Sequence, residues 1–306
     1  MSTPRFDIVG LGENSVDLVL SVPEPPAIAG AANKVRILDR EVRCGGQTAT
    51  AVTAAARLGL RAAYVGAFGH DEYSTVIRSS LKRDGIDVSH AQVREAPNRY
   101  AVILIDRRTG ERMVLWDRDP RLALEADAVP DSLIESTRIL HVDVTDPVAS
   151  ISAAKRARAR DVLVTTDVDR LDENAHEVLT TATHAIVAEH VPHEMTGIDD
   201  LDAAVRAMRQ SIHGVIVVTR GAKGSMAFDT DGTIVYEAGF AVSTQDATGA
   251  GDVFRGGFAY GLVQGWPIHM VLRFANAAAA ISVTRHGAID GAPRRDEVEP
   301  LVHSRD

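Results

Sequence analysis

The decapeptide QDATGAGDVF, at residues 245–254, has two glycines around an alanine and an aspartate directly after them. An apolar pattern with helical spacing begins beyond it and continues through Phe258 and Leu262. Glycines let a backbone approach a ligand closely, and the first turn of a helix has unpaired N–H groups and partial positive charge. The stretch therefore predicts an anion-binding loop that opens a helix.

Asp252 follows this predicted loop directly. A carboxylate repels a bound phosphate, so its presence there needs a chemical reason. We interpret Asp252 as a general base that takes a proton from an attacking hydroxyl. The alternative is an ordinary helix start, in which Thr248 is the N-cap and Asp252 is a first-turn acid that favours the helix dipole.

Composition limits the class of protein. The 306 residues fit one large α/β domain, and a net charge of -9 disfavours nucleic acid as a partner. The single cysteine, Cys44, excludes an intrachain disulfide and a Cys-rich zinc site. The N-terminus lacks the pattern of a signal peptide, and no apolar run reaches the ~18 residues of a membrane span. We therefore expect a cytoplasmic protein without a membrane partner.

Strand and helix patterns alternate along most of the chain, which predicts a parallel sheet. A first buried strand, residues 6–12, ends in a near match to the dinucleotide fingerprint, but the strand-like alternation after it argues against a Rossmann site. Further strands are expected at 62–66, 138–142, 161–166, 184–188 and 215–219, and helices at 47–58, 71–84, 147–159, 172–181, 199–210 and 267–284.

Three segments interrupt this alternation. Strand patterns lie at about 15–22, 34–43 and 99–117, and the last contains a hairpin around residues 107–111. Together they predict a small separate sheet within a single domain that spans residues 1–306. In the hairpin, Val102 and Leu104 and then Val114 and Trp116 alternate with other residues. Such a sheet is too small to bury both faces in a monomer, which predicts a homodimer through it. The alternative is a monomer in which one face of the sheet is exposed to water.

The heptapeptide DATGAGD, residues 246–252, resembles the second signature of the ribokinase-like (PfkB) carbohydrate kinases, D-T-x-G-A-G-D. Residues 45–51 resemble the first signature of that family, with Thr50 in place of the usual asparagine. The resemblance extends in order from Asp17 to Gly287. It implies a three-layer α/β sandwich with a mostly parallel central sheet and a small β-sheet lid.

The resemblance also implies the reaction, which is phosphoryl transfer from MgATP to a hydroxyl of a small carbohydrate. Asp252 would be the general base, and the N–H groups of Gly249, Ala250 and Gly251 would stabilise charge on the transferred group. The sugar-binding residues that it implies are Asp17, Ser15, Gly45, Gly46 and Thr50. The ATP-binding residues that it implies are Thr219, Gly221, Lys223, Gly224 and Asn276.

Metal sites are implied by the same resemblance. The middle strand lacks the family's Asn-x-x-Glu motif, and Glu189 is the nearest substitute for its contact with Mg²⁺ through water. In family members activated by a monovalent cation, Asp246 and Thr248 belong to the K⁺ site. The threonine at position 50 predicts that D-ribose is not the best substrate.

Two other functions stay open. A nucleoside kinase would use the same machinery but needs aromatic groups to stack on the base, and aromatic residues are only 5 % of this chain. A non-catalytic sugar- or nucleotide-sensing module is the second alternative. An intact Asp252 argues against that alternative, because loss of the base is the simplest way to silence the site.

Overall fold

The computed structural model describes residues 4–27 and 33–304. Its centre is an eight-stranded sheet with the order β14-β13-β12-β11-β10-β9-β1-β4. The six strands from β4 to β12 are parallel, and β13 and β14 continue the sheet antiparallel. The strands are β1 (Phe6–Leu11), β4 (Ala62–Val65), β9 (Thr137–Asp143), β10 (Leu163–Asp167), β11 (His184–Ala188), β12 (Val215–Thr219), β13 (Ser225–Phe228) and β14 (Ile234–Glu237).

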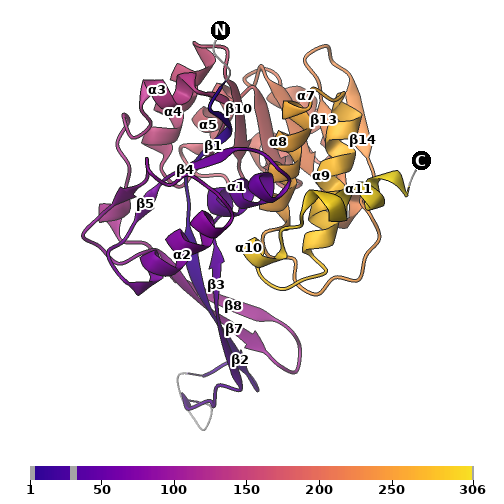
Figure 1. Ribbon diagram of the computed structural model, residues 1–306. Helices are drawn as coiled ribbons and strands as arrows, with labels where there is room; N and C mark the ends of the chain where they lie inside the picture. The colour runs from indigo at the N-terminus through magenta and orange to yellow at the C-terminus, as the bar shows by residue number, and fades with distance from the viewer. Residues whose placement is uncertain (1–3, 28–32, 305–306) are drawn as a thin grey trace.

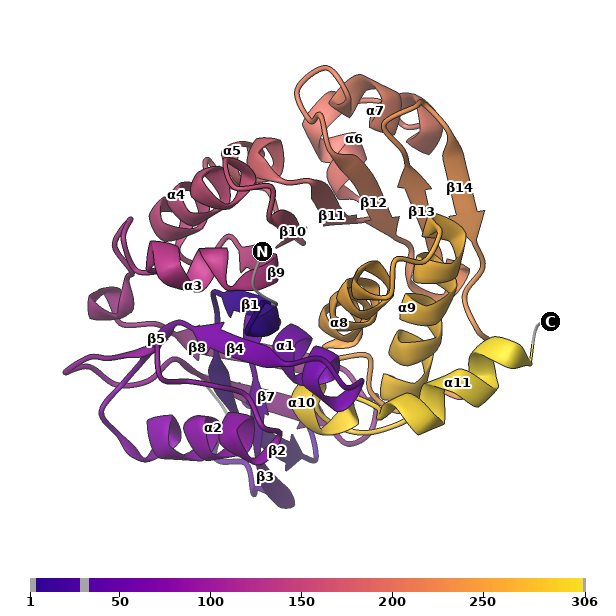
Figure 2. The ribbon, with the colours of Figure 1, turned by 45° about the horizontal axis from the view of Figure 1, so that its top comes forward.

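Helices cover both faces of this sheet (Figure 2). Successive buried residues of β1 point to opposite sides: Val9 and Leu11 join one apolar cluster, and Ile8 joins the other. Against the first face pack α3 (Asp131–Glu135), α4 (Pro147–Arg158), α5 (Ala175–Thr181), α6 (Val191–Thr196) and α7 (Leu201–Met208). Against the second pack α1 (Gln47–Arg57), α2 (Glu72–Arg83), α8 (Ala250–Val263), α9 (Ile268–Ser282), α10 (Ala288–Gly291) and α11 (Arg295–His303). The predicted three-layer α/β sandwich is therefore confirmed.

The small sheet is a second unit that projects from the body of the molecule (Figure 1). Its order is β3-β2-β7-β8, in which β2 and β7 are parallel neighbours. The strands are β2 (Ser15–Val22), β3 (Asp39–Gly45), β7 (Tyr100–Asp106) and β8 (Arg112–Asp117). A separate two-stranded pair consists of β5 (Ala67–Phe68) and β6 (Gln92–Val93).

Three predicted boundaries move in the structure. The strand expected at 34–43 begins only at Asp39, because its pairing with β2 starts opposite Ser21. The helix expected from 172 begins at Ala175, since the Asp172 carboxylate accepts the N–H groups of Asn174 and Ala175 and holds a turn there. Asp200 likewise caps α7 by accepting the N–H of Ala203, so this helix starts later than residue 199.

Short elements also escaped the sequence prediction. The helix α6 is only six residues long, and Pro192 stands in its first turn. Two 3₁₀ turns lie at Pro120–Leu122 and Gly221–Lys223. Among residues 4–27 and 33–304, no helix has both the length and the apolar character that a bilayer crossing requires.

Candidate active site

The predicted anion loop has the tight, left-handed turn that its glycines suggested. Gly249 has φ 76°, and a Cβ atom there would stand 2.5 Å from the Cβ of Ala288, so only glycine fits this turn. The helix α8 begins at the next residue. In the described part of the chain, the N–H groups of Gly249 and Gly251 donate to no backbone carbonyl, whereas that of Ala250 donates to Ala247 O at 3.3 Å. Two of the three predicted N–H donors are thus free for an anion.

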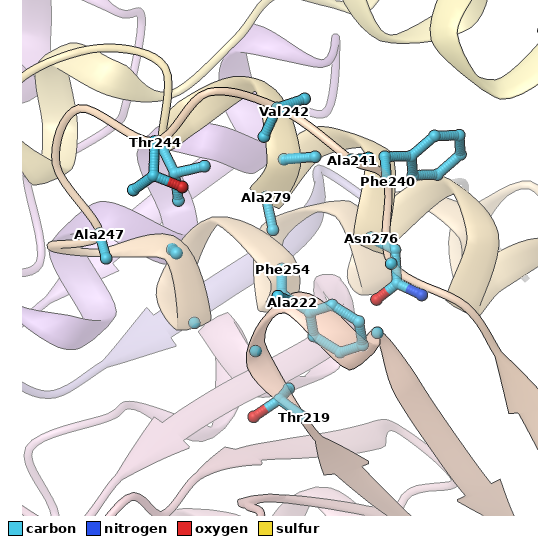
Figure 3. A pocket seen from close by; sticks show the side chains of 17 residues that line it. Thr219, Ala222, Phe240, Ala241, Val242, Thr244, Ala247, Phe254, Asn276 and Ala279 are labelled. Carbon is cyan, nitrogen blue, oxygen red and sulfur yellow. The ribbon is translucent and has the colours of Figure 1, made fainter.

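A first cavity of about 460 Å³ lies on one side of this loop and is mostly apolar. Ala247, Ala250 and Gly251 contribute the loop side, and Figure 3 shows Ala247 there. Four of the predicted ATP residues line it together: Thr219, Gly221, Gly224 and Asn276. Lys223 does not line it, and its Nζ instead lies 3.0 Å from Glu189 Oε1.

The walls of this cavity suit a flat ring. Val242 and Ala279 face Thr219 and Ala222 across the opening (Figure 3). The Asn276 amide donates to the carbonyl oxygen of Glu237 at 3.1 Å, which fixes the side chain at the rim. An apolar slot that ends at free N–H groups fits a nucleotide, with its base in the slot and its phosphates at the loop.

A second cavity of about 400 Å³ lies on the other side of the same loop. Ala247 and Thr248 line it from the loop, and the small sheet lines it with Val19, Ile103 and Ile105. Its polar lining includes Asp17, Arg43, Arg112 and His286. Arg112 of β8 donates to the Thr248 hydroxyl, so the small sheet touches the anion loop directly.

Of the predicted sugar residues, Asp17 lines this second cavity. The Ser15 hydroxyl donates to Asp17 Oδ1 at 2.8 Å and fixes the carboxylate, while burial raises the pKa of Asp17. A Cβ atom on Gly45 would stand 3.1 Å from Asp17 Oδ2, so the glycine leaves room for the carboxylate. Gly46 has φ 98° and lies against the backbone of Asn14.

Thr50 takes a different place from the one expected of a sugar ligand. Its side chain has no exposed surface, and its hydroxyl has no hydrogen-bond partner in the described part of the chain. Its methyl group is 3.4 Å from the position of a Cβ on Gly249, so it packs beneath the anion loop. A direct contact with a sugar stays a prediction for this residue.

Asp252 lies behind the loop and is half-buried. Its carboxyl group shares a hydrogen bond with Asp167, which stands at the end of β10. Burial raises the pKa of Asp252 well above its usual range, the neighbouring Asp167 raises it further, and Arg255 opposes both. Burial likewise raises the pKa of Asp167 to about 7. A raised pKa suits a carboxylate that must accept a proton near neutral pH.

Three charged residues at this site were missed by the sequence reasoning: Glu13, Asp167 and Arg255. Burial raises the pKa of Glu13 to about 7, and its Oε1 lies 2.8 Å from Arg99 Nε. The sequence could have indicated each of them, because a charged residue at the end of a buried strand or within an apolar helix pattern is unusual.

Asp246 is held by several partners. Its carboxylate accepts the N–H groups of Gly287 at 2.9 Å and Thr248 at 3.0 Å. Arg43 NH1 lies 3.2 Å from one oxygen and Arg112 NH1 3.7 Å from the other. Two guanidinium groups therefore offset part of the charge of this carboxylate. A K⁺ site that includes Asp246 and Thr248 stays a prediction of the family resemblance.

Glu189 is also paired, with Lys223 Nζ at 3.0 Å and Arg220 Nε at 3.4 Å. Within the described ranges, no group of three or more His, Cys, Asp or Glu side chains could hold a metal ion. Mg²⁺ in nucleotide sites is held by one or two carboxylates and by the phosphates, and a contact of Glu189 with Mg²⁺ through water stays a prediction.

One glycine loop between a cavity that fits a nucleotide and a second cavity with charged side chains in its lining suits an enzyme that moves a phosphoryl group between two ligands. Residues 6–295 match the pfkB family carbohydrate kinases. The chain therefore belongs to the pfkB family of carbohydrate kinases.

Similar proteins cover nearly the whole chain. A 5-dehydro-2-deoxygluconokinase from Halalkalibacterium halodurans is 24 % identical and spans 99 % of this chain and 96 % of its own. A ribokinase from Bacillus subtilis is 28 % identical over 97 % of this chain and 99 % of its own. The crystal structure of a putative ribokinase from Agrobacterium tumefaciens superimposes with a TM-score of 0.90 at 28 % identity, and covers 98 % of both chains.

Proposed function

We propose that this protein transfers the γ-phosphoryl group of MgATP to a hydroxyl of a small carbohydrate. The observation that carries the proposal is that one loop, residues 247–251, lines both cavities. A donor in the first cavity and an acceptor in the second would meet at the free N–H groups of Gly249 and Gly251. Such positioning supplies most of the catalysis in phosphoryl transfer.

The residues then have distinct tasks. Asp17 accepts hydrogen bonds from sugar hydroxyls and orients the acceptor. Asp252 takes the proton of the attacking hydroxyl. The N–H groups of Gly249 and Gly251 stabilise charge on the transferred group. The small sheet contacts the loop through the hydrogen bond from Arg112 to Thr248, and it excludes water that would otherwise compete as the phosphoryl acceptor. Glu189 would contact Mg²⁺ through water, and the ion, bound together with ATP, would neutralise part of the phosphate charge.

The relatives support this assignment. Their names include kinases of 5-dehydro-2-deoxygluconate and of ribose. An Arabidopsis thaliana ribokinase complexed with ribose and ATP has the same fold, with a TM-score of 0.87 at 23 % identity. A putative ribokinase II from E. coli in complex with ATP and Mg²⁺ also has this fold, at 19 % identity.

The acceptor is expected to be a sugar other than D-ribose, because Thr50 replaces the asparagine of the family signature. A panel of D-ribose, D-fructose, 5-dehydro-2-deoxy-D-gluconate and adenosine, assayed for ADP release and for product mass, tests both the activity and this preference. We expect a phosphorylated sugar as product. The highest kcat/KM for ribose would refute the preference, and one for adenosine would make the protein a nucleoside kinase.

Two observations weigh against the alternatives. The side chains of the small sheet that line the second cavity are aliphatic or charged and none is aromatic, which favours a sugar over a nucleoside base. Asp252 is present and lies beside Asp167, as a base requires and a sensing module does not. Absence of ADP release with every compound, together with tight sugar binding, would favour the sensing module.

We also propose that the protein is a homodimer whose small sheets pack face to face. The outer face of that sheet exposes apolar side chains, among them Val42, Met113 and Leu115. Burial of such a face against a second copy would remove it from water. The cytoplasmic location stays a prediction.

A further inference from the structure

Beneath the anion loop lies an ion pair that the reaction scheme above does not use. Arg255 NH2 of α8 is 2.7 Å from Asp167 Oδ1 at the end of β10, and the two side chains are 3 % and 1 % exposed. Removing two charges from water costs several kcal/mol per ion, and an apolar pair of the same size is often more stable. A purely structural role therefore explains this pair poorly.

The position of the guanidinium group points to the loop. Arg255 lies three residues after Asp252 on α8, so both side chains are on one face of the helix. Its NH1 is 2.9 Å from where a Cβ atom of Gly251 would stand. The positive charge is thus directly against the turn whose N–H groups are free for an anion.

Asp167 joins this guanidinium to the proposed base. It shares a hydrogen bond with Asp252, and Gln47 Nε2 of α1 lies 3.5 Å from its Oδ1. The buried Nε of Arg255 has no hydrogen bond within the described ranges. A pair that served packing alone would satisfy this atom, because an orphaned buried polar group is costly.

We propose that Arg255 and Asp167 are positioning residues, which hold the Asp252 carboxyl group behind the anion loop and control its charge. The inference rests on the proposed function of Asp252 as general base. Asp167 fixes the orientation of the base through their hydrogen bond. Arg255 compensates the two carboxylates and adds positive charge beneath the site of phosphoryl transfer.

The charges around the base set the direction of the expected effects. Acidic groups that face Asp252 or Asp167 are Glu13, Asp143 and Asp169, and the cation that acts on both is Arg255. Loss of the negative charge at position 167 would leave Arg255 to pair with Asp252, which lowers the pKa of Asp252. Loss of the Arg255 guanidinium would leave the two carboxylates without a compensating positive charge, which raises the pKa of Asp252.

The test is a ¹³C NMR titration of the aspartate carboxyl groups in the substrate-free protein, with Asp252→Asn used to assign the resonance. We expect Asp167→Asn to lower the apparent pKa of Asp252 by about 1–3 pH units and Arg255→Met to raise it by a similar amount. Asp84→Asn is the matched control, because it removes another well-buried ion pair, with Arg57 at 2.9 Å. This control should leave the Asp252 resonance unchanged.

Because the titration needs no turnover, failure of the kinase assignment would not affect its result. If the Asp252 resonance moves in the same direction in both variants, or in neither, the inference is overturned. Arg255→Lys covers the case in which Arg255→Met does not fold, since it keeps the charge. We expect Arg255→Lys to hold the pKa of Asp252 within about 1 unit of wild type, and a larger shift would count against the inference.

A kinetic readout completes the test. With D-fructose or D-ribose, whichever turns over faster, Asp167→Asn should shift the acid limb of the kcat/KM profile to lower pH. Arg255→Met should shift the acid limb to higher pH. A loss of activity that is uniform across pH, in variants that melt cooperatively, would assign the pair a structural role alone.

Discussion

At the scale of single residues, Asp252 is the group on which the proposed reaction depends. Asp252→Asn keeps the size and polarity of the side chain but cannot accept a proton. We expect kcat to fall by about 10²–10⁴-fold, with ATP affinity unchanged. Steady-state kinetics and calorimetric ATP binding measure the two effects. Asp231→Asn, at an exposed turn, is the control. Near-normal turnover in a folded Asp252→Asn variant would remove Asp252 from the mechanism.

Glu13 should make the free energy of unfolding depend on pH. Its pKa is raised from 4.5 to about 7, because burial penalises the charged form. Between those pH values the folded chain keeps a proton that the unfolded chain has lost, so the free energy of unfolding falls as pH rises. This decrease in the free energy of unfolding reaches about 3 kcal/mol at most. Above pH 7 both states are ionised and the loss stays constant.

A glutamine at position 13 cannot ionise, so the Glu13→Gln variant should not lose this stability as pH rises. We expect the variant to match wild type at pH 5 and to be the more stable protein at pH 8. Urea unfolding at the two pH values gives the comparison. A difference in the free energy of unfolding that is the same at pH 5 and pH 8 would show that Glu13 does not titrate in this range.

At the scale of elements, the contact between α1 and α8 joins the two halves of the site. The first turn of α1 follows the Gly45–Gly46 turn beside Asp17, and α8 begins with the anion loop. A Cβ atom on Gly256 would stand 2.6 Å from both Ala51 O and Ala54 Cβ. Gly256→Ala should therefore push the helices apart, lower the free energy of unfolding by about 1–3 kcal/mol and raise KM for the sugar.

Gly257→Ala provides the comparison for that experiment. Its nearest neighbour would be Ala275 Cα at 3.0 Å, a looser site on the other side of the same helix. Since alanine favours a helix over glycine by about 1 kcal/mol, we expect little net change. Thermal melts of both variants, with sugar KM values, measure the contrast. Equal behaviour of the two would argue against a tight α1–α8 contact as the cause.

At the scale of the whole molecule, the register of the small sheet defines the surface for a second copy. Leu18, Val102 and Leu115 lie side by side across the sheet with Val42 at its edge, and Leu20, Leu104 and Met113 form a parallel row. Leu115 is 54 % exposed. This continuous apolar face is what a homodimer would bury.

Leu115→Glu should break that dimer, because two carboxylates would enter an apolar interface. Light scattering at micromolar protein should give twice 32.8 kDa for wild type and 32.8 kDa for the variant. Val148→Glu, at an exposed position on α4, should leave the mass unchanged. A wild-type mass of 32.8 kDa with full activity would rule out the dimer as a requirement.

The sequence by itself determined the order of strands and helices, the glycine loop at 247–251 and the presence of a small sheet. These features depend on short-range physics. Period-two and period-3.6 patterns report which way neighbouring side chains point, and a glycine with positive φ is required by the local turn. The family signatures are equally local. They pointed to Asp252, and to Asp17, Thr219, Gly221, Gly224 and Asn276 among the residues that line the two cavities.

The tertiary structure alone decided which distant residues meet. The register of β7 against β8 places Val114 and Trp116 on the cavity side, away from Val102 and Leu104, although all four alternate in the sequence. Asp167 and Arg255 lie 88 positions apart and meet only because α8 packs over β10. Thr50 loses its access to solvent for the same kind of reason, since α8 and its loop cover it. Burial and charge pairing depend on the packing of whole elements, which no local pattern specifies.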